Sequence, residues 1–222
     1  MDLEGKVISF LGDSNFEANR IVDVENDRFD YVLKRICNLK RVNNYGVSGT
    51  RIAHQSHPSP KARHDGNFCI RAWDMDKKSD VIVVMGGSND YGSGDAPLGN
   101  PGDEDRTTFC GSLEYLCNTL KELYPKAKIV FLTPPHCICD YLPSPDPLKV
   151  NCPEKHILVD YVDMVIKIAT SHQIPVFDMF RDLGIDLSDP IQAEKYSFDG
   201  MHFNVEANHI IGEKLAAFLM AL

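Results

Sequence analysis

No stretch of this 222-residue sequence is apolar for long enough to form a membrane-spanning helix. The first residues, MDLEGKVISF, lack the cationic and apolar regions of a signal peptide. The 7 cysteines are an odd number scattered along the chain, which argues against a disulfide framework and for a reducing compartment. We therefore expect a cytoplasmic protein without a membrane span.

Positive charge is in the minority, with 23 Lys and Arg residues against 32 Asp and Glu residues and a net charge of −9. An acidic balance repels phosphate backbones and anionic membrane surfaces, so we expect no nucleic-acid partner. Acidity also keeps a protein soluble, which is a sufficient reason for it. The chain has no internal repeat and is long enough for one sizeable core, so we predict a single domain over residues 1–222.

Short apolar runs alternate with amphipathic stretches along the chain. Near-continuous apolar runs are typical of parallel strands that are covered on both faces. Pro175 indicates an edge strand or a strand start. The five runs that predict strands are Lys6–Leu11, Arg41–Tyr45, Asp80–Met85, Lys128–Leu132 and Ile174–Phe177.

Apolar residues spaced three and four apart lie between these runs and predict helices. Asn204 is a plausible N-cap for the last of them. The alternation predicts a doubly wound α/β domain, with long loops rich in Gly, Pro, His and Asp at 54–73, 91–105 and 141–152. The predicted helices are Phe29–Cys37, Phe109–Leu120, His156–Ser171 and a final one that reaches Leu222.

A serine follows the first predicted strand directly, in Gly12-Asp13-Ser14-Asn15. Glycine lets the chain turn there, and a following helix would point backbone N–H groups at the hydroxyl and favour negative charge beside it. Ligands in such sheets bind beyond the carboxyl ends of the strands. Ser14 is therefore a candidate nucleophile, although Gly-Asp-Ser alone is also a common turn or N-cap sequence.

An aspartate and a histidine lie three residues apart near the end of the chain, in Ser197-Phe198-Asp199-Gly200-Met201-His202. A serine nucleophile needs a base within hydrogen-bond reach, and the base needs an orienting carboxylate. Asp199 can accept the Nδ1 proton of His202 and leave Nε2 free to face Ser14. A surface turn before the last helix is the other interpretation of these residues.

Two more motifs follow predicted strands. The Gly86–Asp90 segment places Asn89 where its amide can donate to the oxyanion formed by serine attack on a carbonyl, and the glycines of Asn44–Thr50 can bring a backbone N–H to the same oxygen. Each motif alone fits an ordinary turn. Together, in the order Ser, Gly, Asn and Asp-x-x-His, with three of them at the ends of successive strands, they indicate one site.

In these four blocks the chain resembles the SGNH hydrolases, also called GDSL esterases and lipases. Gly12-Asp13-Ser14 matches the first block, and Asp199 to His202 matches the last. Asn15 departs from the family, which usually has an aliphatic residue there. The resemblance implies a triad of Ser14, His202 and Asp199.

The middle blocks imply the groups that hold the oxyanion. The last glycine of an Asn-x-Gly-x-x-Gly run points to Gly49, with Gly46 as the alternative, and Gly87-Ser88-Asn89-Asp90 points to Asn89. The backbone N–H of Ser14 is the third implied donor. The resemblance covers essentially the whole chain and implies a three-layer α/β/α fold with a mostly parallel, flavodoxin-like sheet of five strands.

The implied reaction is acyl transfer, without a metal or an organic cofactor. The stretch Tyr91–Gly99, followed by Phe109 onward, looks like that of bacterial members that act on small or carbohydrate-borne esters. We therefore expect a serine esterase for short-chain esters such as O-acetyl groups, with a small-molecule or carbohydrate ester as its substrate.

Three alternatives remain open on the residues alone. A lysophospholipase or thioesterase of the same family is disfavoured by the lack of a long apolar lid. A non-catalytic binding module is disfavoured by the intact triad. A flavodoxin-like nucleotide-binding domain is disfavoured because Leu11–Phe16 lacks the glycine density and the following lysine of a phosphate cradle.

Several other residues invite a functional interpretation. His136-Cys137-Ile138-Cys139 lacks the paired spacing of a zinc site, so we interpret it as a loop beside the fourth strand. We interpret His54, His57 and His64 as loop histidines. Trp73, the single tryptophan, either lines the substrate cleft or packs under its loop.

Overall fold

The computed structural model describes residues 1–59, 61–140 and 156–222. Five strands form one sheet in the order β2-β1-β3-β4-β5, and every pairing among them is parallel. The predicted mostly parallel sheet is thus wholly parallel in the part of the chain that is described. The strands are β1 (Val7–Gly12), β2 (Arg41–Gly46), β3 (Val81–Met85), β4 (Lys128–Leu132) and β5 (Val176–Phe177).

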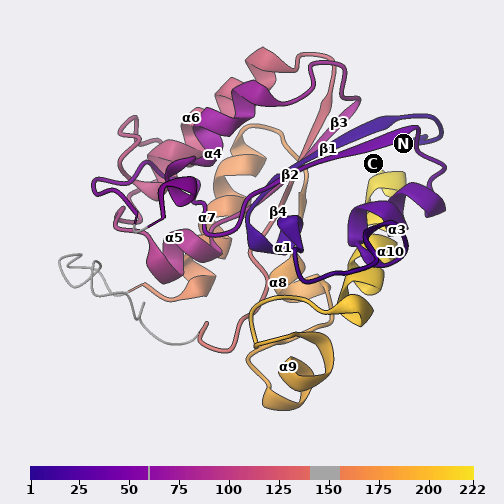
Figure 1. Ribbon diagram of the computed structural model, residues 1–222. Helices are drawn as coiled ribbons and strands as arrows, with labels where there is room; N and C mark the ends of the chain where they lie inside the picture. Colours follow the sequence, from indigo (N-terminus) through magenta and orange to yellow (C-terminus); the bar gives the residue numbers. More distant parts are fainter. Residues whose placement is uncertain (60, 141–155) are drawn as a thin grey trace.

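The central strands are buried because helices cover both faces of the sheet (Figure 1). Successive side chains of a strand point to opposite faces. Accordingly, Ile82 and Val84 of β3 pack into one core cluster, whereas Val81 and Val83 pack into the other. This explains why the strands are apolar throughout rather than at alternate positions.

The longer helices divide into two layers. One cluster joins the sheet to α4 (Phe68–Arg71), α6 (Phe109–Leu123) and α7 (Leu158–Ser171), and the other joins it to α3 (Phe29–Ile36) and α10 (Val205–Ala221). In Figure 1 these two groups lie on either side of the strands. The three-layer α/β/α arrangement predicted by the family resemblance is therefore confirmed.

Side-chain caps fix several helix starts. Thr108 accepts a hydrogen bond from the N–H of Gly111 and begins α6, and Asn204 accepts one from Ala207 and begins α10, as the sequence predicted. The remaining helices are short. They are α1 (Ser14–Glu17), α2 (Val24–Asp27), η1 (Ala62–Asp65), η2 (Ala72–Asp74), α5 (Ser88–Ser93), α8 (Met179–Asp182) and α9 (Pro190–Tyr196).

The loop prediction for residues 54–73 was wrong in part, since η1, α4 and the start of η2 lie within it. Asn67 caps α4 by accepting from the N–H of Ile70, and Phe68 anchors the helix in the core. The predicted loop 91–105 holds the end of α5 and is otherwise irregular. The predicted loop 141–152 lies outside the described residues.

The last strand is shorter than predicted. Pro175 cannot donate to the ladder, and β5 comprises only Val176 and Phe177, at the edge of the sheet. The carbonyl of Pro175 still accepts a hydrogen bond from the N–H of Phe131, so this residue is bonded to β4 although it cannot donate.

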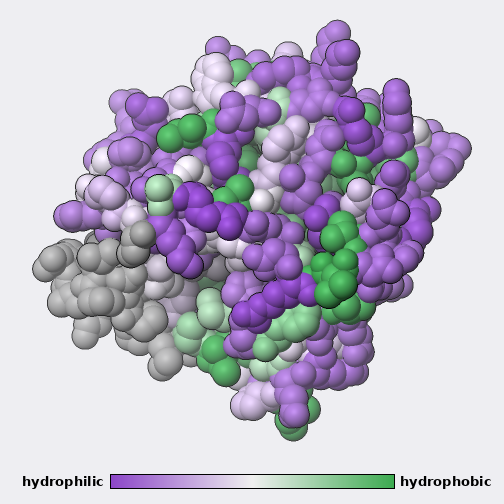
Figure 2. Space-filling model, viewed as in Figure 1, coloured by the Kyte–Doolittle hydropathy of each residue, from purple (hydrophilic) through white to green (hydrophobic). Residues whose placement is uncertain are grey.

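No helix in the described ranges combines the length and apolar character that crossing a membrane requires. The face of the molecule shown in Figure 2 is mainly hydrophilic, with apolar residues in separate small groups.

Helices α3 and α10 pack closely at Gly212, and this contact generates a prediction. A Cβ added at Gly212 would lie 2.7 Å from Cβ of Val32 and 2.9 Å from the carbonyl oxygen of Phe29. We expect Gly212→Ala to lower the free energy of unfolding by about 1–3 kcal/mol, because overpacking forces these helices apart. Urea unfolding checks this value.

Gly92→Ala in α5 is the matched control, because nothing lies within 4 Å of its added Cβ. It should leave stability unchanged or raise it by up to about 1 kcal/mol. A Gly212→Ala protein as stable as the wild type would contradict the close packing.

Candidate active site

Three of the predicted site residues lie at the same edge of the sheet. The strands are parallel, so their carboxyl ends meet at this edge, and each of these residues follows a strand. Ser14 follows β1, Gly49 follows β2 and Asn89 follows β3. All three line a pocket of about 260 Å³, to which His202 also contributes. Asp13 caps α1 by accepting from the N–H of Asn15, so Ser14 is the first residue of that helix.

The structure brings the serine, the imidazole and the carboxylate into line. Oγ of Ser14 lies 3.0 Å from Nε2 of His202, and Nδ1 of His202 lies 2.8 Å from Oδ2 of Asp199. With Nδ1–H donating to the carboxylate, Nε2 is free to accept the serine proton. This is the arrangement of a serine hydrolase.

A tight turn presents His202. Oδ1 of Asp199 accepts the backbone N–H groups of Met201, at 3.1 Å, and of His202, at 2.9 Å. Gly200 has a φ of +80°, and an added Cβ would lie 2.9 Å from Cβ of Ile138. The aspartate therefore holds both the ring and the backbone of the histidine, in a turn that requires glycine.

Asn15 fastens this turn to the nucleophile helix. Its amide Nδ2 donates to the carbonyl of Met201 at 3.2 Å, and its Oδ1 accepts from the N–H of Phe203 at 3.3 Å. The two bonds lie on either side of His202. The residue that departs from the family pattern thus points to the histidine turn, and it also lines the edge of the pocket.

Donors for an oxyanion are available from Ser14, Gly49 and Asn89. Among the described residues, no acceptor takes the backbone N–H of Ser14 or of Gly49. Gly46 differs, because its N–H donates to Oδ1 of Asn44 at 2.8 Å. Nδ2 of Asn89 donates one hydrogen to the carbonyl of Thr50 at 3.1 Å, which leaves its second hydrogen for a ligand. The geometry favours Gly49 over Gly46.

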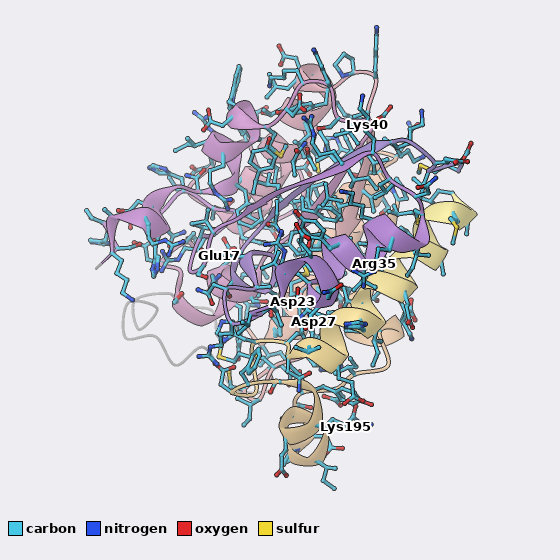
Figure 3. All side chains as sticks on the ribbon, turned by 45° about the vertical axis from the view of Figure 1, so that its right-hand side comes forward. Glu17, Asp23, Asp27, Arg35, Lys40 and Lys195 are labelled. Atoms are coloured by element: carbon cyan, nitrogen blue, oxygen red, sulfur yellow. The ribbon has the colours of Figure 1, made fainter. Side chains whose placement is uncertain are left out.

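Sequence reasoning missed the side chains that hold the loop of Gly49. Glu17, labelled in Figure 3, accepts from the backbone N–H of Ser48 at 2.6 Å and from Nη2 of Arg63 at 2.8 Å. Arg71, which is half-buried, donates to the carbonyl of Gly12 and to Oγ1 of Thr50. Nothing in the local sequence marks these residues, because each acts on a segment that is distant along the chain.

The carboxylate of Asp199 has a second charged partner. Nη1 of Arg20 lies 2.8 Å from Oδ2 of Asp199. Burial raises the pKa of this carboxyl, but hydrogen bonds from the ring and backbone of His202 and from Met201 outweigh it and hold the pKa below its usual range. Asp199 is therefore ionised and available to accept the Nδ1 proton.

Asp13 is different, because it is buried beside the nucleophile. Burial raises the pKa of Asp13 to about 6, although the hydrogen bond from the N–H of Asn15 and the nearby His202 and Arg71 each lower this pKa. An ionised Asp13 therefore carries a desolvation penalty at neutral pH.

The structure also places the other histidines and the tryptophan that were considered in the sequence. His136 and His64 line the pocket of Ser14, and the ring of His64 lies against Gly49, whose φ is +77°. Trp73 does not line the pocket of Ser14, which was one of its two interpretations. Trp73 is half-exposed and lines a separate cavity of about 690 Å³ with His54 and Tyr115. His57 bonds Asp95 in an exposed loop.

Comparison with known proteins agrees with this arrangement. The model of the GDSL-like lipase/acylhydrolase family matches residues 10–210. The chain belongs to this family of hydrolases. No curated protein matches it.

Solved structures are similar over nearly their whole length. A protein from Lactobacillus plantarum is 29% identical, with a TM-score of 0.81, and the match covers 98% of both chains. An aryl esterase from M. smegmatis, in an inhibitor-bound form, is 17% identical with a TM-score of 0.64 and covers 98% of this chain and 99% of that one. A lipase/acylhydrolase from Enterococcus faecalis is 18% identical with a TM-score of 0.60, covering 97% and 96%. The last two show the shared fold.

Burial of Asp13 predicts a pH-dependent effect of Asp13→Asn. Its pKa, about 6 when folded and 3.8 ordinarily, means that the folded protein binds this proton more tightly than the unfolded chain. The carboxyl therefore costs stability as pH rises from about 4 to 6, by about 3 kcal/mol in all. We expect Asp13→Asn to gain about that much more, relative to wild type, at pH 8 than at pH 4.

Urea unfolding at both pH values measures this difference. Asp23→Asn is the matched control, because Asp23 caps α2 in the same way but is exposed to solvent (Figure 3). The same gain for Asp13→Asn at both pH values would contradict the raised pKa.

Proposed function

We propose that the protein is a serine esterase that hydrolyses short-chain carboxylic esters through an acyl-enzyme. The observation that carries this proposal is the alignment of Ser14, His202 and Asp199, with Oγ to Nε2 at 3.0 Å and Nδ1 to Oδ2 at 2.8 Å. Aryl esterase and lipase/acylhydrolase are the names of two proteins with the same fold.

In the proposed reaction, Ser14 attacks the ester carbonyl while Nε2 of His202 takes the hydroxyl proton. The N–H groups of Ser14 and Gly49 and the amide of Asn89 donate to the oxyanion. The imidazolium then protonates the leaving alcohol. Water resolves the acyl-enzyme by the same steps, with His202 again as the base. Asp199 accepts the hydrogen bond from Nδ1–H of His202 throughout.

The size of the pocket supports a small acyl group. At about 260 Å³ it lies below the range of about 300–1,000 Å³ that is usual for sites of drug-sized ligands. We therefore propose acetyl and similar esters, including those borne by a carbohydrate, whose sugar would lie outside the pocket.

Hydrolysis of p-nitrophenyl acetate, butyrate and octanoate by wild type and Ser14→Ala tests the proposal. We expect activity on the two short esters, little on the octanoate, and a loss of about 10,000-fold or more in kcat for Ser14→Ala. Ser171→Ala in α7, outside the pocket, should behave as wild type.

The other outcomes select the alternatives. A preference for the octanoate would favour a lysophospholipase or thioesterase. Equal rates for wild type and Ser14→Ala would overturn the serine mechanism and favour a binding module.

The two hydrogen bonds of Asn15, to Met201 and Phe203, hold the turn that presents His202. We predict that removing them lowers kcat without weakening substrate binding. Asn15→Leu, which restores an aliphatic residue, removes both hydrogen bonds that bracket His202. Each is worth about 1 kcal/mol, and a loss of about 2 kcal/mol in all would lower kcat for p-nitrophenyl acetate by up to about 30-fold. We expect KM to change far less. Asn15→Asp should lie between, because it keeps the acceptor for Phe203 and loses the donor to Met201. A kcat within twofold of wild type in Asn15→Leu would show that these two hydrogen bonds have no catalytic effect.

A further inference from the structure

Besides His202, two imidazoles line the pocket of Ser14, those of His64 and His136, and the reaction proposed above uses neither. Nδ1 of His136 hydrogen bonds Oδ2 of Asp140 and lies 3.4 Å from Oδ1 of Asp186. The ring also lies on Phe180, with 3.6 Å between the ring centroids. Within the described ranges Nε2 of His136 makes no hydrogen bond, so it is the polar ring atom left for a ligand.

Two carboxylates lie behind His136 and face its Nδ1 atom. Asp140 is completely buried at its side chain, and its Oδ1 has no partner in the described part of the chain. A buried carboxylate is costly unless it is paired with a positive group. His136 is the group that Asp140 contacts, and Asp186 adds a second negative charge. With Nδ1 held by these carboxylates, Nε2–H is the donor that the ring offers to the pocket.

A lysine and a further histidine line the same pocket. Lys61 and His64 line it from the segment after β2, whereas His136 lines it from the segment after β4. The sheet order β2-β1-β3-β4 places these segments on the two sides of Ser14 and Asn89. Burial, together with the positive charges of Arg51, Lys61 and Arg63, lowers the pKa of His64, so Lys61 rather than His64 brings positive charge to the pocket at neutral pH.

Negative charge is scarce in this pocket although the chain carries −9. Among the described residues that line it, buried Asp13 is the one carboxylate. The larger cavity beside Trp73 shows the opposite balance, with Asp74, Glu104 and Asp105 in its lining. A pocket whose lining is poor in carboxylates and has a lysine at its rim repels anionic ligands less than the rest of this acidic surface does.

We propose that the pocket selects esters that carry an anionic oxygen group, a carboxylate or a phosphate, and that Nε2 of His136 donates a hydrogen bond to it. Lys61, which is exposed at the opposite rim, attracts the same group without a fixed contact. This proposal rests on the proposed function, because the anion belongs to an ester whose carbonyl meets Ser14. It makes His136 a specificity-determining residue rather than part of the triad.

Binding to Ser14→Ala protein tests the anion site without turnover. Monomethyl succinate and inorganic phosphate, titrated at constant ionic strength and followed by NMR, distinguish a carboxylate from a phosphate ligand. Methyl butyrate is the neutral counterpart of the succinate ester. We expect one of the anions to bind at least about 10-fold more tightly than methyl butyrate, as a charge-assisted hydrogen bond permits.

The key variant is the double substitution His136→Gln with Asp140→Asn. It removes the imidazole without leaving Asp140 as an unpaired buried carboxylate, so folding is less at risk than with His136→Gln alone. We expect it to abolish the preference for the anion and to leave the binding of methyl butyrate unchanged. Lys61→Gln should weaken anion binding by only a few-fold, because an exposed charge contributes little.

Turnover of the same esters by the protein with Ser14 intact completes the test. We expect kcat/KM for monomethyl succinate to exceed that for methyl butyrate by about 10-fold or more, and the double variant to equalise them. Equal binding and equal turnover of both esters in wild type would overturn the anion site and leave the esterase standing. Anion binding without hydrolysis of any ester would support the site and overturn the esterase.

Discussion

The site depends on the hydrogen bonding of β1 to both of its neighbours. The parallel registers pair Gly12 with Gly46 on one side and with Met85 on the other. Because all three strands end at the same level, the residues that follow them, Ser14, Gly49 and Asn89, meet around one pocket. A one-residue slip in either ladder would move a donor away from the nucleophile and turn its strand's buried side chains to the wrong face.

The base reaches this edge from the other end of the chain, and its position has to be fixed by separate contacts. Asp199 bonds the backbone and ring of His202, Asn15 bonds the residues on either side of it, and Ile138 packs under the glycine of the turn. A nucleophile and a base on different segments need such supports, since small shifts in their separation alter proton transfer.

Much of this could be predicted from the sequence where the signal is local. Apolar runs located the strands, and turn residues at their ends located Ser14, Asn89 and the Asp199 to His202 pair. The short helices within residues 54–73 were missed because one-turn elements are too short to show a periodic pattern. The environment of His136 was also out of reach, because Asp140 and Asp186 approach it only in the folded chain.

Glu17 links two parts of the site that otherwise belong to different strands. Its carboxylate lies at the end of the nucleophile helix, yet it bonds Ser48, next to Gly49, and Arg63, next to His64. The helix that begins at Ser14, the loop of Gly49 and the rim of the pocket are consequently held together by one side chain. Substitutions in these segments will be energetically coupled rather than additive, so the contribution of any one of them to catalysis is defined only by a double-mutant cycle with its partner.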